Sequence, residues 1–224
     1  MRVYTLPGVF RPRDDSRRLA ALAAAEPLPP RPRILDVCTG SGIVGVAAAR
    51  RPDAPEVWAL DVSRRAVVTA WLNARLNGAR IRARRGDLLA PVRGLTFDLI
   101  LANPPYVPGD EPPPARGAAR AWEGGPDGRA VLDRLLAEAP PLLAPGGVLV
   151  VTHSSLSGEE ATLEALRTAG LEPEVRARVR GGLGPIVAAR ARELRSRGVL
   201  SGERDEEEVL VIAGHRPAPD PRRP

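Results

Sequence analysis

The stretch Asp36-Val37-Cys38-Thr39-Gly40-Ser41-Gly42 decides the fold expected for this chain of 224 residues. It begins inside the apolar run Arg33–Cys38, which indicates a buried strand, and it leads into the helical pattern of Ile43–Arg50. Glycines between a strand and a helix let the backbone pass close to a ligand, because no Cβ stands in the way. The spacing differs from the Gly-x-Gly-x-x-Gly dinucleotide fingerprint. We therefore expect a ligand-binding strand–turn–helix unit of another kind.

Strand and helix patterns alternate along the rest of the chain. Strands are expected at Arg33–Cys38, Glu56–Leu60, Ile81–Arg84, Phe97–Ala102, Val148–Thr152, Glu174–Arg180 and Glu208–Gly214, and helices at Arg17–Ala25, Ile43–Arg50, Arg64–Leu76, Ala130–Leu143, Glu159–Thr168 and Ile186–Arg197. Such alternation indicates an α/β fold, in which helices cover both faces of a mostly parallel sheet. We expect an N-terminal segment at residues 1–32, one domain at 33–216 and a disordered tail at 217–224.

Two local features complete this outline. Asp15 or Ser16 is expected to cap the first helix, since both side chains accept hydrogen bonds from free backbone N–H groups. The helix Ala130–Leu143 is expected to end at Pro145-Gly146-Gly147.

Composition excludes several classes of protein. All 33 basic residues are arginine, so a lysine base or Schiff base is excluded. The single cysteine, Cys38, excludes a disulfide framework and a cysteine-rich metal site, and we expect no metal. No apolar run is long enough to cross a bilayer, and the N-terminus lacks a signal-peptide pattern. We therefore expect a cytoplasmic protein without a membrane partner.

Three carboxylates follow three successive strand patterns. Asp36 would repel a pyrophosphate and suits a cationic ligand, such as an amino acid ammonium or a sulfonium, which favours S-adenosylmethionine over NAD. Asp61 ends the second strand, where an acidic residue commonly accepts hydrogen bonds from ribose hydroxyls. Asp87, followed by Leu88, could accept one from the adenine amino group. Together they predict a nucleoside site at one edge of the sheet.

The stretch Asn103-Pro104-Pro105-Tyr106 comes directly after the strand Phe97–Ala102. Its prolines fix φ and remove backbone donors, which leaves the Asn103 side-chain oxygen and the Pro104 carbonyl as acceptors. Tyr106 adds a ring on which a flat group can stack. An amide or adenine nitrogen is a poor nucleophile, so its methylation depends on positioning and polarisation by such acceptors. We expect this loop to orient a planar N–H₂ group toward a sulfonium methyl.

These motifs resemble the HemK-type protein-glutamine methyltransferases. The similarity extends to Ala121–Arg129 and Asp133-Arg134, a signature of the short archaeal and eukaryotic branch, and to Pro12 and Asp14-Asp15-Ser16 of an N-terminal segment that folds over the cofactor. The resemblance implies a class I methyltransferase fold, with a seven-stranded sheet of order 3-2-1-4-5-7-6 and one reversed strand. It also implies S-adenosyl-L-methionine as cofactor and, as acceptor, the glutamine of a release-factor Gly-Gly-Gln loop.

The candidate site combines the residues from these arguments. The expected cofactor-binding residues are Ser16, Asp36, Thr39, Gly40, Gly42, Asp61, Asp87, Leu88 and Asn103, and the expected catalytic residues are Asn103, Pro104, Pro105 and Tyr106. His153 could border the pocket, although a plain strand-end histidine is the simpler interpretation.

The residues alone do not identify the methyl acceptor or the partner molecules. A small-molecule methyltransferase and an adenine-N6 methyltransferase of DNA or RNA are the alternatives, since Asn-Pro-Pro-Tyr occurs in the latter too. We expect a protein substrate, with a release factor as the first candidate, an activating protein partner, and nucleic acid only indirectly. The basic stretch with Arg190, Arg192, Arg195 and Arg197 is either a solvated helix face or a substrate-docking element.

Overall fold

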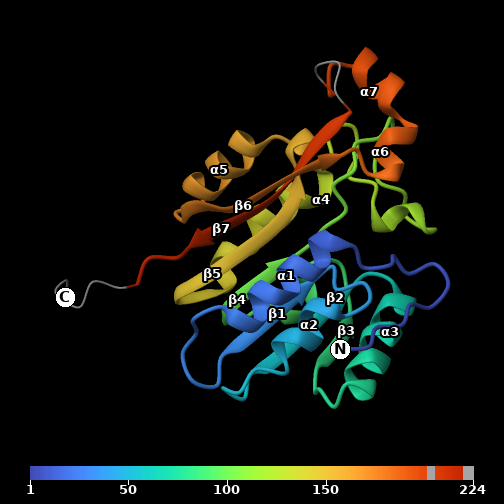
Figure 1. Cartoon of the computed structure of the whole chain (residues 1–224). Coiled ribbons are helices and arrows are strands. Elements are labelled where there is room, and N and C mark those ends of the chain that lie inside the picture. The colour runs from blue at the N-terminus through green and yellow to red at the C-terminus, as the bar shows by residue number, and fades with distance from the viewer. Residues whose placement is uncertain (201–204, 219–224) are drawn as a thin grey trace.

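The protein is a seven-stranded α/β sandwich, seen here in a computed structural model that describes residues 1–200 and 205–218 (Figure 1). The strands are β1 (Arg33–Val37), β2 (Glu56–Asp61), β3 (Arg82–Arg85), β4 (Phe97–Ala102), β5 (Leu143–Ser154), β6 (Glu172–Gly182) and β7 (Glu206–His215). The helices are α1 (Asp14–Ala25), α2 (Ile43–Ala48), α3 (Arg64–Leu76), α4 (Ala130–Glu138), α5 (Glu159–Thr168), α6 (Pro185–Ala189) and α7 (Ala191–Ser196).

The sheet has the strand order that the family resemblance implies. It runs β3-β2-β1-β4-β5-β7-β6, and β7 alone is antiparallel to its neighbours β5 and β6. The order reverses between β1 and β4, which pair in parallel with Leu35 opposite Ile100. In sheets of this kind, ligands bind outside the carboxyl ends of the strands at this reversal.

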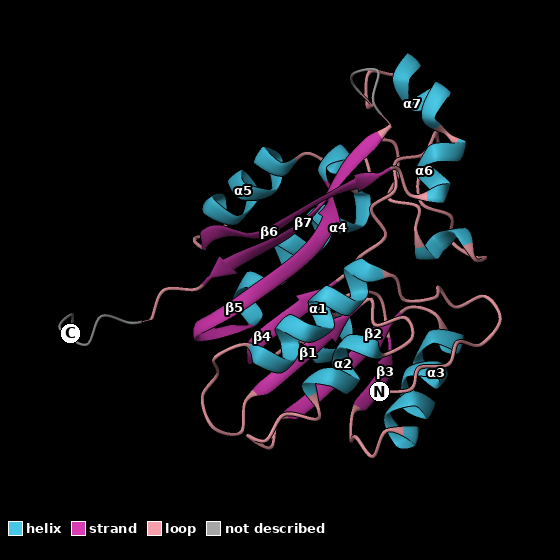
Figure 2. Cartoon of the chain, viewed as in Figure 1, coloured by secondary structure: helices cyan, strands magenta, loops and turns pink. Residues whose placement is uncertain are grey.

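Alternate side chains of the strands point to two different cores. Leu35 and Ile100 pack on one face with Leu132 of α4 and Leu166 of α5. On the other face, Ile34 packs with α1 and α2, and α3 packs beside α2. Figure 2 shows these two helical layers on either side of the strands. The α1 helix, within the segment 1–32, is therefore an integral part of the second core rather than a loose extension.

Two predictions about helix ends were wrong: the C-terminal end of α4, where two prolines follow, and the N-terminal cap of α1. Helix α4 ends at Glu138 rather than Leu143, because Pro140 and Pro141 cannot continue it and form a 3-10 turn, Pro140–Leu142. Strand β5 begins at Leu143 and includes Pro145, with a register shift against β4 at this point. The expected cap of α1 was also wrong. The helix begins at Asp14, so Asp15 and Ser16 lie in its first turn, and Arg13 occupies the cap position without a side-chain bond.

The C-terminal third also differs from expectation. The predicted helix Ile186–Arg197 is two short helices, α6 and α7, separated at Arg190. Both lie between β6 and β7 in sequence and form the upper right of the view in Figure 1. Of the predicted tail, residues 219–224 lie outside the described residues. No helix in the described ranges is both long enough and apolar enough to cross a bilayer.

Candidate functional site

A cavity of about 1120 Å³ lies where the predicted motifs meet. It is lined by the glycine turn after β1, the ends of β2, β3 and β4, and the N-terminal segment before and within α1. The predicted site residues that line it are Ser16, Asp36, Thr39, Gly40, Asp61, Asp87, Leu88, Asn103, Pro104, Pro105 and Tyr106. Gly42 and His153 are not among its lining residues. The structure thus brings together residues that the sequence separates by nearly ninety positions.

Gly42 has a packing role at the start of α2. Its φ is +81°, a left-handed conformation that favours glycine, and a Cβ there would lie 2.7 Å from the Cα and Cβ of Ala70 on α3. Gly42 therefore sets how closely α2 approaches α3. His153 is fully buried in β5 and contacts the Ser154 carbonyl, as the simpler interpretation predicts.

The carboxylate of Asp36 holds the glycine turn in place. Its Oδ2 accepts hydrogen bonds from the Thr39 hydroxyl at 2.5 Å and from the Gly45 backbone N–H at 2.9 Å. Gly45 was missed by the sequence analysis, although a glycine inside a short helix was the signal: a Cβ there would lie 3.1 Å from Asp36 Oδ2. Burial raises the pKa of Asp36 to about 7. A nearby cation would favour the ionised form of this carboxyl.

Asp61 ties the end of β2 to the same turn. Its Oδ2 accepts from the Gly40 N–H at 3.0 Å and its Oδ1 from the Ser63 N–H at 2.8 Å. Burial raises the pKa of Asp61. Each carboxylate oxygen can accept a second hydrogen bond, so both remain able to receive a hydroxyl from a ligand.

Asp87 and Leu88 form the far wall of the cavity, beyond β3. Asp87 is paired with Arg134 of α4, whose Nη2 lies 2.8 Å from Oδ2. Leu88 is buried with a φ of +42°. The sequence spacing alone did not indicate this largely exposed ion pair between Arg134 and Asp87.

The Asn103 amide is held by the first turn of α1. Its Nδ2 donates to Asp15 Oδ2 at 3.1 Å and lies 3.0 Å from Ser16 Oγ. Its Oδ1 is buried and has no hydrogen-bond partner among the residues that the structure describes. The Tyr106 hydroxyl donates to the same Asp15 oxygen at 2.9 Å. Asp15 was not among the predicted site residues, because its partners lie far along the chain.

The phenol of Tyr106 is a hydrogen-bond donor here. Burial, and then the charge of Asp15, raise the pKa of Tyr106 well above its ordinary value. The group therefore stays protonated and can donate to Asp15. On the other side, the Ser157 hydroxyl donates to the Tyr106 carbonyl at 3.0 Å. The loop after β4 is thus fixed at both its side chains and its backbone.

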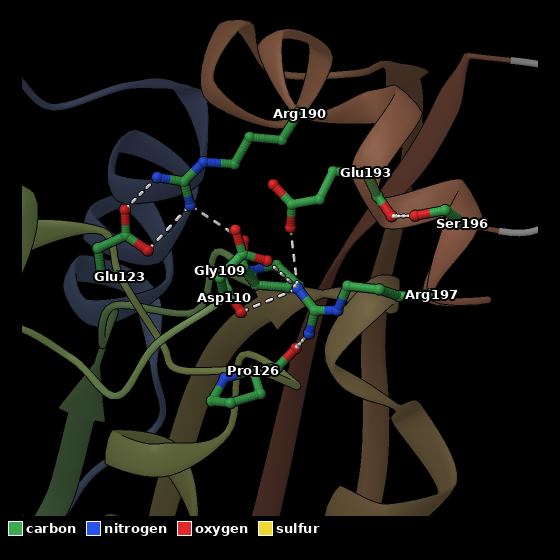
Figure 3. A network of polar contacts seen from close by, with 9 residues as sticks. Gly109, Asp110, Glu123, Pro126, Arg190, Glu193, Ser196 and Arg197 are labelled. Carbon is green, nitrogen blue, oxygen red and sulfur yellow. Dashed lines mark hydrogen bonds and ion pairs between the residues drawn. The ribbon is translucent and has the colours of Figure 1, made fainter.

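Two arginines at the ends of α6 and α7 hold the loop that follows, residues 107–129: Arg190 lies between the helices and Arg197 directly after α7. Arg190 pairs with Glu123, with 2.9 Å between Nη1 and Oε2, and also donates to the Pro108 carbonyl (Figure 3). Arg197 donates to the Gly109 carbonyl at 2.9 Å and to the Pro126 carbonyl at 2.5 Å. In Figure 3 both guanidinium groups point away from their helices and toward this loop.

This network revises the interpretation of the basic stretch. Arg190, Arg195 and Arg197 form ion pairs within the chain, and only Arg192 among the four predicted arginines is left on the surface without such a pair in the described residues. Gly184, Ile186 and Val187 at the start of α6 line the cavity. The basic stretch is therefore mainly a structural support for the mouth of the cavity.

Comparison with known proteins identifies the family of this chain. The model of the methyltransferase small domain family matches residues 1–117. A putative protein N5-glutamine methyltransferase of Methanocaldococcus jannaschii is 37% identical over 148 residues, which are 66% of this chain and 74% of that relative. A release factor glutamine methyltransferase of Moorella thermoacetica is 39% identical over 162 residues, a match to 68% of this chain and 57% of that relative's length.

A solved structure shows the same fold. It is the Mtq2–Trm112 complex of E. cuniculi, described as responsible for methylation of the eRF1 translation termination factor. One of its chains superposes with a TM-score of 0.63 at 20% identity, covering 93% of this chain and 99% of that chain. At this identity the likeness concerns the architecture of the sheet and its helices.

The Arg190–Glu123 pair should contribute measurably to stability. Arg190→Ala leaves Glu123, whose side chain is 11% exposed, without its partner. We expect the free energy of unfolding to fall by about 2 kcal/mol, less than for a fully buried pair because Arg190 is itself 28% exposed. Urea denaturation measures the change.

Arg192→Ala is the matched control, since Arg192 lies on the surface of the same segment. It should change stability by less than about 0.5 kcal/mol. Equal denaturation midpoints for the two variants would contradict the structural role of Arg190.

Proposed function

This chain belongs to the methyltransferase small domain family, and we propose that it methylates the side-chain amide nitrogen of a glutamine in a protein. The family and the relatives make it an S-adenosylmethionine-dependent N-methyltransferase. The buried Oδ1 of Asn103 beside the cavity, unpartnered among the described residues, supports an acceptor that carries an N–H group, and the relatives support glutamine in particular. A buried acceptor without a donor is costly, so it suits a site at which a ligand supplies the N–H group.

We propose that the cofactor lies across the carboxyl ends of β1 to β3. Asp61 would receive the ribose hydroxyls, and Asp87 and Leu88 would border the adenine. The turn residues Thr39 and Gly40, with the Asp36 carboxylate, would face the charged methionine portion. Ser16, in the first turn of α1, would cover the cofactor on the side of the N-terminal segment. Gly42 would keep α2 packed closely against α3.

The acceptor amide would enter between the cofactor and the loop Asn103–Tyr106. Its two N–H bonds would be accepted by Asn103 Oδ1 and the Pro104 carbonyl. This draws the nitrogen toward tetrahedral geometry and aims its lone pair at the sulfonium methyl. The new N–CH3 bond would replace the S–CH3 bond, S-adenosylhomocysteine would be the leaving group, and the methylated nitrogen, now strongly acidic, would release its proton to solvent. S-adenosylmethionine supplies the electrophilic methyl group, and the protein supplies orientation and polarisation.

The Gly-Gly-Gln loop of a release factor is the substrate that we propose. The two curated relatives named above are described as protein glutamine and release factor glutamine methyltransferases, which supports this choice. Two glycines beside the glutamine give a narrow backbone, which suits a cavity mouth held rigidly by α6, α7 and the proline-rich loop. Because release factors act at the ribosome, the proposed reaction takes place in the cytoplasm.

We also propose that an activating protein partner covers α3. This helix exposes an apolar stripe of Val68, Trp71, Leu72 and Leu76, with exposures from 38% to 62%. Apolar side chains grouped in this way commonly mark a protein contact, and the E. cuniculi relative was solved as a two-protein complex. A photoreactive residue at position 71 should cross-link to the protein that raises the methylation rate. Cross-linking of that protein from elsewhere, but not from position 71, would contradict the proposal.

The Asp36 carboxyl should make cofactor binding depend on pH. Its pKa of about 7 falls when a cation binds beside it, so binding releases a proton below pH 7. The association constant should therefore rise about tenfold between pH 6 and pH 8, as the carboxyl ionises, and level off above. Calorimetry with S-adenosylmethionine measures this profile.

Asp36→Asn is the control for this experiment, because it keeps an acceptor for Thr39 and Gly45 but removes the charge. Any titration of the ligand itself appears equally in both proteins. In the variant, the association constant should lose the increase between pH 6 and pH 8 that comes from ionisation of Asp36. Identical profiles for the two proteins would remove Asp36 from contact with the charged ligand.

The function is tested with labelled S-adenosylmethionine and a release factor. Mass spectrometry should find one added methyl group on the glutamine of the Gly-Gly-Gln loop. Asn103→Ala should lower kcat by about 10²–10³-fold, since a preorganised acceptor for the nucleophile is lost. Its affinity for the cofactor should change by less than about threefold, because Asn103 faces the acceptor nitrogen.

Two results would overturn this function. Label that enters adenine in DNA or RNA, with none in protein, would favour the nucleic-acid alternative. Label that enters only metabolites would favour a small-molecule acceptor.

A further inference from the structure

We propose that Asp15 is a positioning residue that fixes the Asn103 amide with its oxygen toward the methyl acceptor. This inference rests on the proposed function, since it concerns how the same site orients its acceptor. It assigns a role in methyl transfer to the first turn of α1, a helix that also packs against α2 in the second core and lines the cavity.

The contacts determine which way the Asn103 amide faces. One side of the amide, Nδ2, has two N–H groups, and Asp15 Oδ2 and Ser16 Oγ lie 3.1 and 3.0 Å from it. Both are able to accept. The opposite side, Oδ1, is buried without a partner. A flipped amide would place Oδ1 against the Asp15 carboxylate, where two acceptors repel, and would leave both N–H groups unpaired.

The Asp15 carboxylate is itself held by four donors. Its Oδ1 receives the Ser16 backbone N–H at 2.6 Å and the Ser16 hydroxyl at 3.2 Å. Its Oδ2 receives Asn103 Nδ2 and the Tyr106 hydroxyl. The Ser16 hydroxyl gives its only proton to Asp15, so it can act only as an acceptor toward Asn103. The whole group therefore has one consistent pattern of donors and acceptors.

The negative charge of Asp15 should also strengthen the Asn103 oxygen as an acceptor. A carboxylate that accepts from one end of an amide polarises it and increases the electron density on its oxygen. During methyl transfer the acceptor nitrogen becomes positive and its N–H groups become better donors. The bond to Asn103 Oδ1 therefore strengthens as the reaction proceeds, and Asp15 contributes to it without touching the substrate.

Asp15→Ala tests this role in the methylation assay. We expect kcat to fall by about 10- to 100-fold, as for residues that orient a reacting group, while the dissociation constant of S-adenosylhomocysteine changes by less than about threefold. Asp15→Asn keeps an acceptor but removes the charge, so its kcat should lie between those of Asp15→Ala and the wild type. Asp14→Ala is the matched control: Asp14 lies in the same turn, is 85% exposed and, within the described ranges, forms its ion pair with Arg17 alone. Its activity should equal that of the wild type.

A double-mutant cycle separates positioning from a general loss of structure. If Asp15 acts through Asn103, adding Asp15→Ala to Asn103→Ala should cause little further loss of kcat. Losses that multiply would overturn the proposal, as would a loss of cofactor affinity as large as the loss of kcat.

A second readout requires no activity. The Asn103 side-chain amide gives two N–H resonances in ¹⁵N NMR, identified by their absence in Asn103→Ala. In the wild type both should be protected from exchange with water, and in Asp15→Ala that protection should be lost. Unchanged protection would overturn the role of Asp15 whatever the substrate is. Protected resonances in a wild type that does not methylate glutamine would instead contradict the proposed function.

Discussion

The hydrogen bonds from the Asn103 amide to the first turn of α1 join the two halves of the site. One half is the sheet edge, where β1, β2 and β4 present the glycine turn, Asp61 and the Asn-Pro-Pro-Tyr loop. The other is the N-terminal segment, which packs on α2 through Leu19 and Ala23. Because Nδ2 is committed to Asp15 and Ser16, the amide oxygen is the group left for a ligand. The packing of α1 therefore determines the direction in which Asn103 Oδ1 points.

The surroundings make this arrangement stiff. Pro104 and Pro105 restrict the backbone between Asn103 and Tyr106, and Arg190 and Arg197 attach the following loop to α6 and α7. Such stiffness matters for a weak nucleophile, because its reactivity depends on orientation more than on removal of a proton. The arginine-rich composition serves this purpose here: guanidinium groups reach backbone carbonyls and carboxylates at the same time.

Much of the fold and part of the site could be predicted from the sequence. The strand order follows from the alternation of strands and helices together with the family resemblance, and the carboxyl ends of parallel strands necessarily bring Asp36, Asp61 and Asn103 to one edge. The resemblance placed the N-terminal segment over the cofactor site, but the individual side-chain contacts between distant segments could not be predicted. Asp15 lies 88 residues from Asn103, and Arg190 lies 67 residues from Glu123. The helix ends were misjudged where prolines or an uncapped first turn outweighed the apolar pattern.

A structure of the chain with S-adenosylhomocysteine and a peptide that contains Gly-Gly-Gln would show directly which atoms of the Asn103–Tyr106 loop contact the acceptor amide. We expect the glutamine amide nitrogen to lie within about 3 Å of both Asn103 Oδ1 and the Pro104 carbonyl oxygen. The Asn103 Nδ2 should remain bound to Asp15 in that complex. An Asn103 amide turned with its nitrogen toward the peptide, or a glutamine bound outside the cavity, would contradict it.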